Sequence, residues 1–250
     1  MKTKKLRSVS LLGILLSLIF LMLVVHSCSD DDTLLPLPEE EEQDGGDDFI
    51  WGQPCDDMPT ISYEGQVYET VRVGDQCWMR ENLNVGTMIT SCQEMTDNGI
   101  IEKYCQDDDP ANCETYGGLY QWDEAMRYQD EEGVRGICPP GWHIPTKADW
   151  QELEDFLGDN PGGKLKSFSG WNDPNTGANN LSGFTALPGG HRGGACSLFY
   201  NIDQEGRWWT SNEQSSIGAW RQTLYHDSTT VNLNANFKYY GISVRCILSN

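Results

Sequence analysis

Hydrophobic and polar residues alternate near both ends of the segment 60–248, and helical spacing appears between these ends. Alternating runs separated by turn residues predict two or three short strands over residues 61–79. Apolar residues at helical spacing predict one helix over residues 118–129. A second helix is predicted from the capping box of Thr146 and Asp149 up to Gly158. Further strands are expected toward the C-terminus, at 207–210, 219–225, 230–233 and 239–248.

The segment 158–194 is rich in glycine, asparagine and proline and is expected to be a long irregular loop. Four apolar side chains are expected to pin this loop to the core: Phe168, Trp171, Phe184 and Leu187. Strands at both ends of the domain, with two helices and the long loop between them, predict an α+β fold.

The first residues have the pattern of an export signal. A basic stretch within residues 2–7 precedes an apolar run at 11–25, and these 15 positions are fewer than the roughly 20 that span a bilayer. The small residue before Cys28 resembles the lipobox of bacterial lipoproteins, although His26 departs from its usual pattern. We therefore expect residues 1–27 to be a lipoprotein signal peptide and Cys28 to be lipidated. An ordinary secretory signal or an uncleaved anchor is the alternative.

Residues 28–50 are expected to be the lipidated cysteine and a disordered acidic tether. Positions 29–50 hold ten acidic residues and no basic one, so this stretch repels itself and has too little apolar surface to fold. The acids directly after Cys28 resemble the export signal of lipoproteins displayed by Bacteroidota. This resemblance implies an outer-membrane protein that faces the cell exterior, unless these acids merely begin the tether. The remaining residues 51–250 form the predicted domain, with a core at about 60–248.

Charge and composition exclude some classes of protein. The formal net charge of −21 argues against a nucleic-acid partner, because such proteins need a basic face to bind phosphates. It also means that acyl chains, rather than basic residues, must hold the chain at a membrane. The hydrophobic fraction of 38%, with 10% aromatic residues, is sufficient for a folded core.

Eight cysteines remain when Cys28 is set aside, and an even number in an exported domain indicates a disulfide framework. Composition alone leaves 105 connectivities open. Cys105 and Cys113 bracket a short acidic loop that a disulfide between them would close. Zinc binding is disfavoured because the sequence has no two cysteines separated by two residues, the usual spacing of zinc ligands.

Several sequence blocks resemble a known family. They are GDQCWMRENL at 74–83, YGGLYQW at 116–122, CPPGWHIPT at 138–146, GFTALPGG at 183–190, WWTS at 208–211 and SVRC at 243–246. Over roughly residues 60–248 the chain resembles the Fibrobacter succinogenes major paralogous domain. Members of that family are mostly exported proteins and lipoproteins of Bacteroidota and Fibrobacteres, and their biochemical role is poorly defined.

Residues 141–150 and the closing 244–246 are also similar, more distantly, to the C-type-lectin-like fold, which includes sugar-binding lectins and the formylglycine-generating enzyme. This resemblance implies that strands from the two chain ends pair and that the last cysteine joins an earlier one near a helix. The disulfides expected with it are Cys138–Cys246, Cys55–Cys77, Cys105–Cys113 and, as an addition to the family pattern, Cys92–Cys196.

We do not expect an enzyme. None of the common hydrolase or nucleotide-binding motifs occurs, and nothing singles out two carboxylates for glycoside hydrolysis. His143 is interpreted as a structural residue, and Arg192 is expected to tie its loop to the core. Cys246 has no neighbouring cysteine of the kind that formylglycine-generating enzymes use. No cofactor is expected; the acidic loop of Asp107, Asp108 and Asp109 is a weak candidate for Ca²⁺ and more often a solvated tip.

Two non-catalytic functions remain, glycan binding and protein contact by an adhesin or structural lipoprotein. Trp171 and Trp220 lie outside the core of the family blocks and are the candidates for exposed sugar-binding rings, whereas the tryptophans within the blocks are expected in the core. A glycan-binding protein should show an aromatic platform beside polar groups. An adhesin should instead show an exposed apolar patch on residues 158–194.

Overall fold

The computed structural model describes residues 51–194, 196 and 198–249. Contacts divide the chain into two units, 1–47 and 48–250, and all described residues belong to the second unit. The expected signal peptide, Cys28 and the acidic tether lie outside the described residues.

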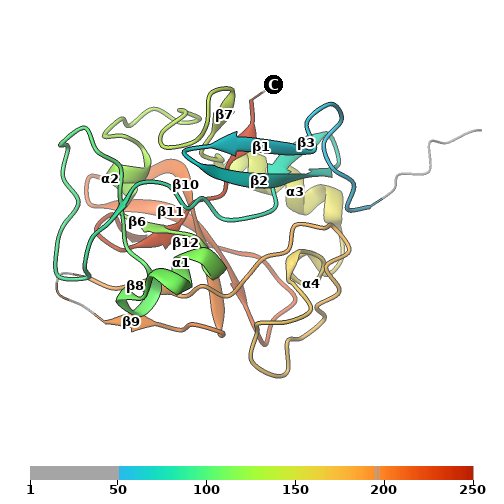
Figure 1. The fold of residues 1–250 in the computed structure, drawn as a ribbon. Coiled ribbons are helices and arrows are strands. Elements are labelled where there is room, and N and C mark those ends of the chain that lie inside the picture. Colours follow the sequence, from blue (N-terminus) through green and yellow to red (C-terminus); the bar gives the residue numbers. More distant parts are fainter. Residues whose placement is uncertain (1–50, 195, 197, 250) are drawn as a thin grey trace, which may run out of the picture. The chain divides into compact units, whose positions relative to one another are not determined.

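A five-stranded sheet joins the two ends of the domain. Its strands, in spatial order, are β1 (Thr60–Tyr63), β2 (Gln66–Val73), β3 (Gln76–Met79), β14 (Ile247–Leu248) and β7 (Trp142–His143). Ile247 pairs with Trp78 in antiparallel register, so strands from the two termini are neighbours as expected. Figure 1 shows the red C-terminal segment beside the blue N-terminal strands.

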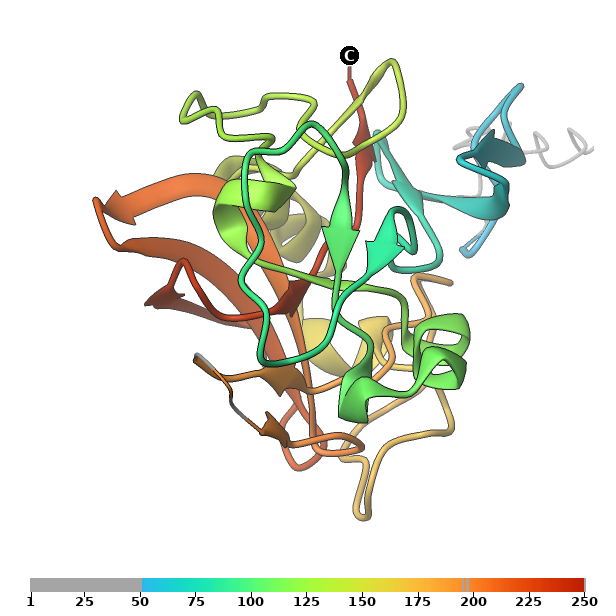
Figure 2. The same ribbon diagram turned by 60° about the vertical axis from the view of Figure 1, so that its left-hand side comes forward.

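A second five-stranded sheet forms the other half of the domain. Its order is β12 (Asn232–Phe237), β11 (Gly218–Tyr225), β10 (Glu205–Ser215), β13 (Ile242–Ser243) and β6 (Leu119–Tyr120). Two small ladders complete the strands: β4 (Thr87–Met88) with β5 (Glu102–Lys103), and β8 (His191–Arg192) with β9 (Phe199–Tyr200). In Figure 2 the orange strands of the second sheet lie on the opposite side of the view from the blue N-terminal hairpin.

The helices differ in part from those predicted. Helix α3 (Lys147–Leu157) is confirmed, and both hydrogen bonds of its capping box are present between Thr146 and Asp149. The prediction of a helix over 118–129 is wrong, because Leu119–Tyr120 pairs with β13 as strand β6 and only α2 (Trp122–Ala125) is helical. Two further α-helices, α1 (Pro110–Tyr116) and α4 (Pro161–Leu165), and the 3₁₀ helix η1 (Gln106–Asp108) were not predicted. The described residues therefore hold four α-helices rather than two.

The long loop 158–194 contains α4 and β8 and is otherwise irregular. Trp171 and Phe184 pack into the core as predicted, but the prediction for Phe168 is wrong, since 73% of its surface is exposed. A buried lysine accounts for much of the order of this loop. The Lys166 ammonium donates to four carbonyl oxygens at 3.0–3.3 Å, those of Thr176, Tyr225, His226 and Ser228. Because these acceptors come from both the loop and the end of β11, one side chain joins the two segments.

Four disulfides close the domain, and they join the same pairs that were expected: Cys55–Cys77, Cys92–Cys196, Cys105–Cys113 and Cys138–Cys246. The Cys138–Cys246 bond lies inside a core that also includes Trp142, Trp209 and Val244. A second core packs Trp78, Trp150, Trp208 and Phe184. The tryptophans of the family blocks are therefore structural, as expected.

Candidate functional site

The two tryptophans predicted to be exposed do not form a binding surface. Trp171 is 8% exposed, and its indole N–H donates to the Ala186 carbonyl at 3.0 Å. Of the two roles predicted for Trp171, the structure supports packing into the core, and the prediction of an exposed sugar-binding ring is wrong because the loop folds back and buries the indole. Trp220 is half-buried, and the Lys147 ammonium lies 5.1 Å from the centre of its ring.

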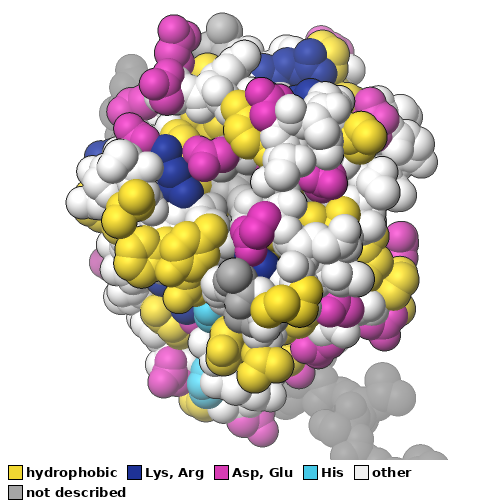
Figure 3. Space-filling view, turned by 90° about the vertical axis from the view of Figure 1, so that its left-hand side faces the viewer, with side chains coloured by type: hydrophobic (Ala, Val, Ile, Leu, Met, Phe, Trp, Pro, Cys, Tyr) yellow, Lys and Arg dark blue, Asp and Glu magenta, His cyan; other side chains and the backbone are white. Residues whose placement is uncertain are grey.

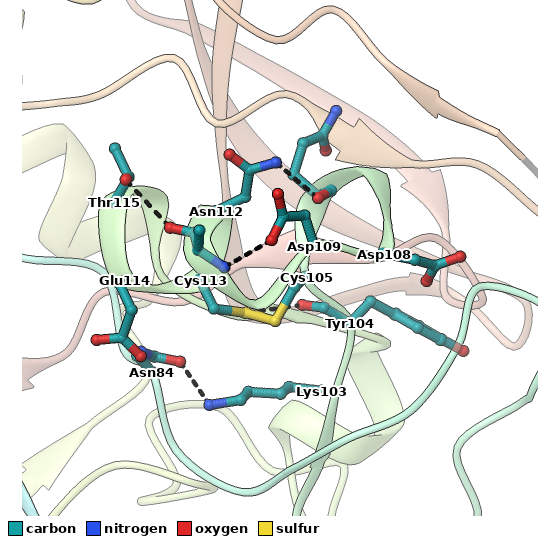
Figure 4. The surroundings of a disulfide bond; sticks show 12 residues. Asn84, Lys103, Tyr104, Cys105, Asp108, Asp109, Asn112, Cys113, Glu114 and Thr115 are labelled. Carbon is teal, nitrogen blue, oxygen red and sulfur yellow. Dashed lines mark hydrogen bonds between the residues drawn. A yellow bond between two sulfur atoms is a disulfide. The ribbon is translucent and has the colours of Figure 1, made fainter.

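The acidic loop is folded, and its carboxylates have separate roles. Asp109 caps α1 by accepting a hydrogen bond from the Ala111 N–H at 3.0 Å, and Asp108 accepts two bonds from Ser91 at 2.8 Å. Asp107 is exposed, at a backbone φ of 59°. Figure 4 shows Asp108 and Asp109 pointing in different directions beside the Cys105–Cys113 disulfide. Hence this segment is the start of a helix, and its three aspartates are exposed to solvent as expected from sequence.

A row of stacked rings lies on the second half of the domain. The aromatic row comprises Phe237, Tyr239, Tyr240, His191 and Tyr200. Successive ring centres are 5.2–5.7 Å apart, and the planes of successive rings differ by 8–29°. Phe237, Tyr239 and Tyr200 are 46%, 45% and 44% exposed, so the row presents apolar ring surface to solvent.

Two segments carry the aromatic row, and Arg192 holds them together. Phe237, Tyr239 and Tyr240 lie at the end of β12 and in the turn that leads to β13, whereas His191 and Tyr200 lie on the β8–β9 ladder. The fully buried guanidinium of Arg192 donates to the carbonyls of Tyr239 and Ser91. Arg192 therefore ties its loop to the core, as expected from sequence.

The middle of the row is fixed by a buried ionic group. His191 Nδ1 lies 2.7 Å from Glu205 Oε1, and the same carboxylate pairs with the Arg207 guanidinium at 2.7 Å. Burial lowers the pKa of His191, and the hydrogen bond with Glu205 only partly opposes this. Burial alone would raise the pKa of Glu205, but the His191 hydrogen bond and the Arg207 charge lower it below its ordinary value. At neutral pH the His191 ring is therefore neutral and available for stacking on both neighbours.

A pocket of about 320 Å³ lies beside the row. Its apolar wall comes from Ile217, Ala235, Phe237 and Tyr240, and polar groups come from Gln214, Ser215 and Asn236. The Asn236 amide nitrogen is buried and has no hydrogen-bond partner among the described residues. Figure 3 shows several groups of hydrophobic side chains on one face of the molecule, with acidic side chains between them. The surface thus combines flat rings with polar groups, one of which is unsatisfied.

A second hollow, of about 210 Å³, is lined mainly by the start of β2, the segment that follows β3, and α1. It brings Glu81 and Glu114 to the same cavity, together with Arg80 and Asn84, a grouping that the sequence could not single out. Burial raises the pKa of Glu81. Tyr68 and Tyr116 also line it, but no exposed ring forms a platform there, so the aromatic row is the stronger candidate for a binding surface.

Sequence reasoning missed the aromatic row. Tyr239 and Tyr240 were placed in the predicted strand 239–248, the other three members received no role, and His191 and Tyr200 lie about forty residues before Phe237. A local signal did exist in the four residues 237–240, where three of the side chains are aromatic and a glycine follows.

Comparison with known proteins gives one match. The family model of the Fibrobacter succinogenes major domain matches residues 71–248, which is more than half of the chain. No curated protein and no solved structure matches. Within the part of the chain that the structure describes, no helix has the length and apolar character needed to cross a membrane.

Proposed function

The chain belongs to the Fibrobacter succinogenes major domain family, and we propose that it is a cell-surface lipoprotein whose residues 51–250 form a non-catalytic, glycan-binding module of C-type-lectin-like character. The N-terminal pattern supports the lipoprotein part of this proposal, because it ends in Cys28 and leads into an acidic tether. The outer membrane, facing the cell exterior, is the location that this pattern favours.

The aromatic row carries the glycan part of the proposal. Sugar rings have apolar faces that stack on aromatic rings, while their hydroxyl groups need hydrogen-bond partners. Phe237, Tyr239 and Tyr200 supply exposed rings, and the pocket beside them supplies amide and hydroxyl groups. This is the combination that a glycan-binding surface requires, although tyrosine and phenylalanine provide it here in place of Trp171 and Trp220.

Protein contact is the alternative, and one observation favours it. Ile217 and Leu198, on turns that neighbour the row, are 62% and 72% exposed, and aliphatic side chains contribute little to sugar binding. The apolar patch that an adhesin would show on residues 158–194 is limited to scattered side chains such as Phe168 and Leu181. The glycan proposal is therefore the better supported of the two, and an enzymatic role has less support than either.

A glycan array tests the proposal. The full-length protein, purified in detergent with its disulfides formed, is screened in calcium and then in EDTA. We expect selective binding that Tyr239→Ala weakens at least tenfold, because this change removes an exposed ring and leaves the carbonyl that accepts from Arg192 in place. Phe168→Ala removes an even more exposed ring that lies outside the row, and it is the control.

The outcomes separate the possibilities. Binding that persists in EDTA supports a site built from rings and polar side chains, whereas loss in EDTA directs attention to a calcium site such as the acidic loop. The glycan proposal is rejected if no glycan binds across a broad array, or if Tyr239→Ala and Phe168→Ala weaken binding equally. Protein contact is then the better-supported function.

The membrane anchor is tested separately with Cys28→Ala. Without the acylated thiol the protein should move from the membrane fraction to the soluble fraction, since the acidic tether has no attraction for anionic lipid. A variant that fractionates with membranes like the parent protein contradicts lipidation at Cys28.

A further inference from the structure

Strand β12 lies at the edge of the second sheet, where β11 is its neighbour on one side only. Four of its six residues are exposed, and they include Leu233 at 42% and Phe237 at 46%. Among the described elements, β12 packs chiefly against β11. The side of the strand that faces away from β11 is therefore accessible along most of its length.

The register shows which main-chain groups point to this accessible side. Phe237 lies opposite Gly218, and the Lys238 N–H donates to the Ile217 carbonyl at 3.0 Å. In an antiparallel ladder, a bond in this position flanks a pair of residues that do not bond to each other. The N–H and C=O groups of Phe237 therefore point away from β11.

The same orientation recurs at every second residue of β12, because bonded and non-bonded pairs alternate along the ladder. Leu233, Ala235 and Phe237 thus direct their main-chain groups outward. The Phe237 carbonyl accepts from the Tyr240 N–H at 3.1 Å and the Leu233 carbonyl from the Asn234 amide at 2.8 Å, but a carbonyl oxygen has two lone pairs and accepts a second bond. This row of donors and acceptors is a template for another strand.

The edge lacks the features that normally prevent strand pairing between proteins, which are charged side chains, proline and bulges. The sequence of β12 is NLNANF, and its pairing with β11 runs without a shift in register. The uncharged edge strand of the first sheet, β1, is shorter and is followed directly by Glu64. An unprotected edge of this length indicates that a further strand pairs with β12.

The charge of the second sheet permits another copy of the same chain to approach. Strands β10, β11 and β12 together carry two acids, Glu205 and Glu213, and two bases, Arg207 and Arg221, so their net charge is zero. Lys238, directly after β12, is already paired with Glu213. The chain as a whole has a formal net charge of −21, so most other surfaces of two copies repel each other.

The exposed side chains of the edge are also complementary to themselves. In an antiparallel pair centred on Ala235, Leu233 of each copy lies opposite Phe237 of the other copy, on the same face of the sheet. Both side chains are exposed in the single chain, so each of these contacts removes apolar surface from water. No charged residue of β12 meets another across the pair.

We propose that two copies of the chain pair through their β12 edges, antiparallel about Ala235, and join their second sheets into one continuous sheet. Each Ala235 donates its N–H to the carbonyl of the other, and Leu233 and Phe237 exchange the flanking hydrogen bonds. This inference concerns assembly and goes beyond the proposed glycan binding. Because the pairing involves five residues of each strand, fewer than the roughly 20–30 per partner of a stable interface, the dimer forms reversibly.

The first test measures the protein mass by light scattering over a range of concentrations. The full-length protein is used in detergent with its disulfides formed, and we expect the mass to rise to that of two chains. Ala235→Lys should weaken association at least tenfold, because it places two positive charges opposite each other at the centre of the pair. Val67→Lys introduces the same charge at an exposed position of β2 and is the control that should change nothing.

Single cysteines then test the register. Opposed residues that exchange hydrogen bonds have Cα atoms about 5.5 Å apart, within the range of a disulfide. Ala235→Cys should therefore form a covalent dimer on mild oxidation, whereas Ser62→Cys, an exposed position on β1, should not. Leu233→Cys should cross-link with Phe237→Cys but not with itself, because the two copies of residue 233 lie about 13 Å apart along the strands.

The outcomes decide between the possibilities. The parent protein shows how much cross-linking Cys28 itself gives, and an excess in Ala235→Cys alone supports the pairing. A mass of one chain at every concentration, a larger aggregate in place of a dimer, or a dimer that Ala235→Lys leaves intact overturns it. Equal cross-linking of Ala235→Cys and Ser62→Cys also overturns it, and self-linking of Leu233→Cys overturns the register. None of these measurements involves a glycan, so failure of the pairing leaves the proposed function untouched.

Discussion

The side chain of Asn82 joins three distant blocks of the domain, and its removal should be costly. Its Oδ1 accepts hydrogen bonds from the Trp208 indole at 2.7 Å and from Arg245 Nε and Nη2 at 3.0 and 2.8 Å. Its Nδ2 donates to the Tyr116 carbonyl at 2.8 Å. Asn82, Trp208 and Arg245 are all buried, and Arg245 also packs against the Phe184 ring. One amide thus connects the end of β3 to β10, to the turn before β14 and to α1.

The magnitude follows from the groups that Asn82→Ala leaves unpaired. A buried neutral donor without a partner costs about 1–3 kcal/mol. Breaking a buried charged network by removing one partner costs about 3–5 kcal/mol. We therefore expect Asn82→Ala to lower the free energy of unfolding by about 4–8 kcal/mol, a large part of the roughly 5–15 kcal/mol typical of a domain.

A second variant separates the loss of the acceptor from the loss of the side chain. Asn82→Asp keeps an oxygen for Trp208 and Arg245 and adds a charge that the guanidinium favours, but it places a carboxylate against the Tyr116 carbonyl. Its expected cost is about 1–2 kcal/mol. Asn98→Ala removes an exposed amide and should change stability by no more than about 0.5 kcal/mol.

Urea unfolding followed by far-ultraviolet circular dichroism, with the disulfides intact, measures all three variants. A loss of less than about 1 kcal/mol for Asn82→Ala, or a larger loss for Asn82→Asp than for Asn82→Ala, would refute the reasoning, because the buried guanidinium would then not depend on this acceptor.

Two further predictions concern stability. Replacing Cys138 and Cys246, a pair 108 positions apart, by serine should lower the free energy of unfolding by about 5 kcal/mol. The same change at Cys105 and Cys113, which are 8 positions apart, should lower it by about 2.5 kcal/mol. A larger loss for the Cys105–Cys113 pair in urea unfolding would contradict this prediction. Burial, followed by the charge of a neighbouring acid, raises the pKa of Glu154 to about 7, so its ionisation destabilises the fold as pH rises from about 4.5 to 7. Glu154→Gln should therefore leave the free energy of unfolding unchanged at pH 4 and raise it by about 1–2 kcal/mol at pH 8, and equal unfolding curves at pH 8 would refute this.

Local signals in the sequence were sufficient where neighbouring residues determine the structure. Helix α3 was predicted because Thr146 and Asp149 form the capping box and Gly158 ends the helix, and all three act within one turn of the helix ends. Helix α1 had an equally local signal in Asp109, its N-cap, and Pro110, its first residue, which the acidic composition of the loop obscured.

Long-range pairing explains the main error in the fold. Apolar residues in 118–129 recur at helical spacing, yet Leu119 and Tyr120 form a strand with Ile242 and Ser243, more than a hundred residues away. The backbone then leaves the helical region at Arg127 and Tyr128, whose φ angles are positive. Periodicity describes which side chains are buried, but here the burial comes from a sheet and a short helix rather than from one long helix.

The same limit applies to the candidate site. Tryptophans are abundant in this chain, so the sequence directed attention to Trp171 and Trp220, but a buried indole needs only one acceptor, and the Ala186 carbonyl provides it for Trp171. The exposed rings belong instead to tyrosine and phenylalanine on two segments. Their proximity depends on Arg192, whose contacts with Ser91 and Tyr239 span 101 and 47 positions of sequence.

The way in which these segments are held bears on binding. The Cys92–Cys196 disulfide and the Arg192 hydrogen bonds join the segment around Ser91 to the β8–β9 turn, and Arg192 also holds the turn that carries Tyr239. A surface whose rings are already ordered loses little conformational entropy when a ligand binds. The Cys92–Cys196 disulfide therefore supports the segments that carry the aromatic row.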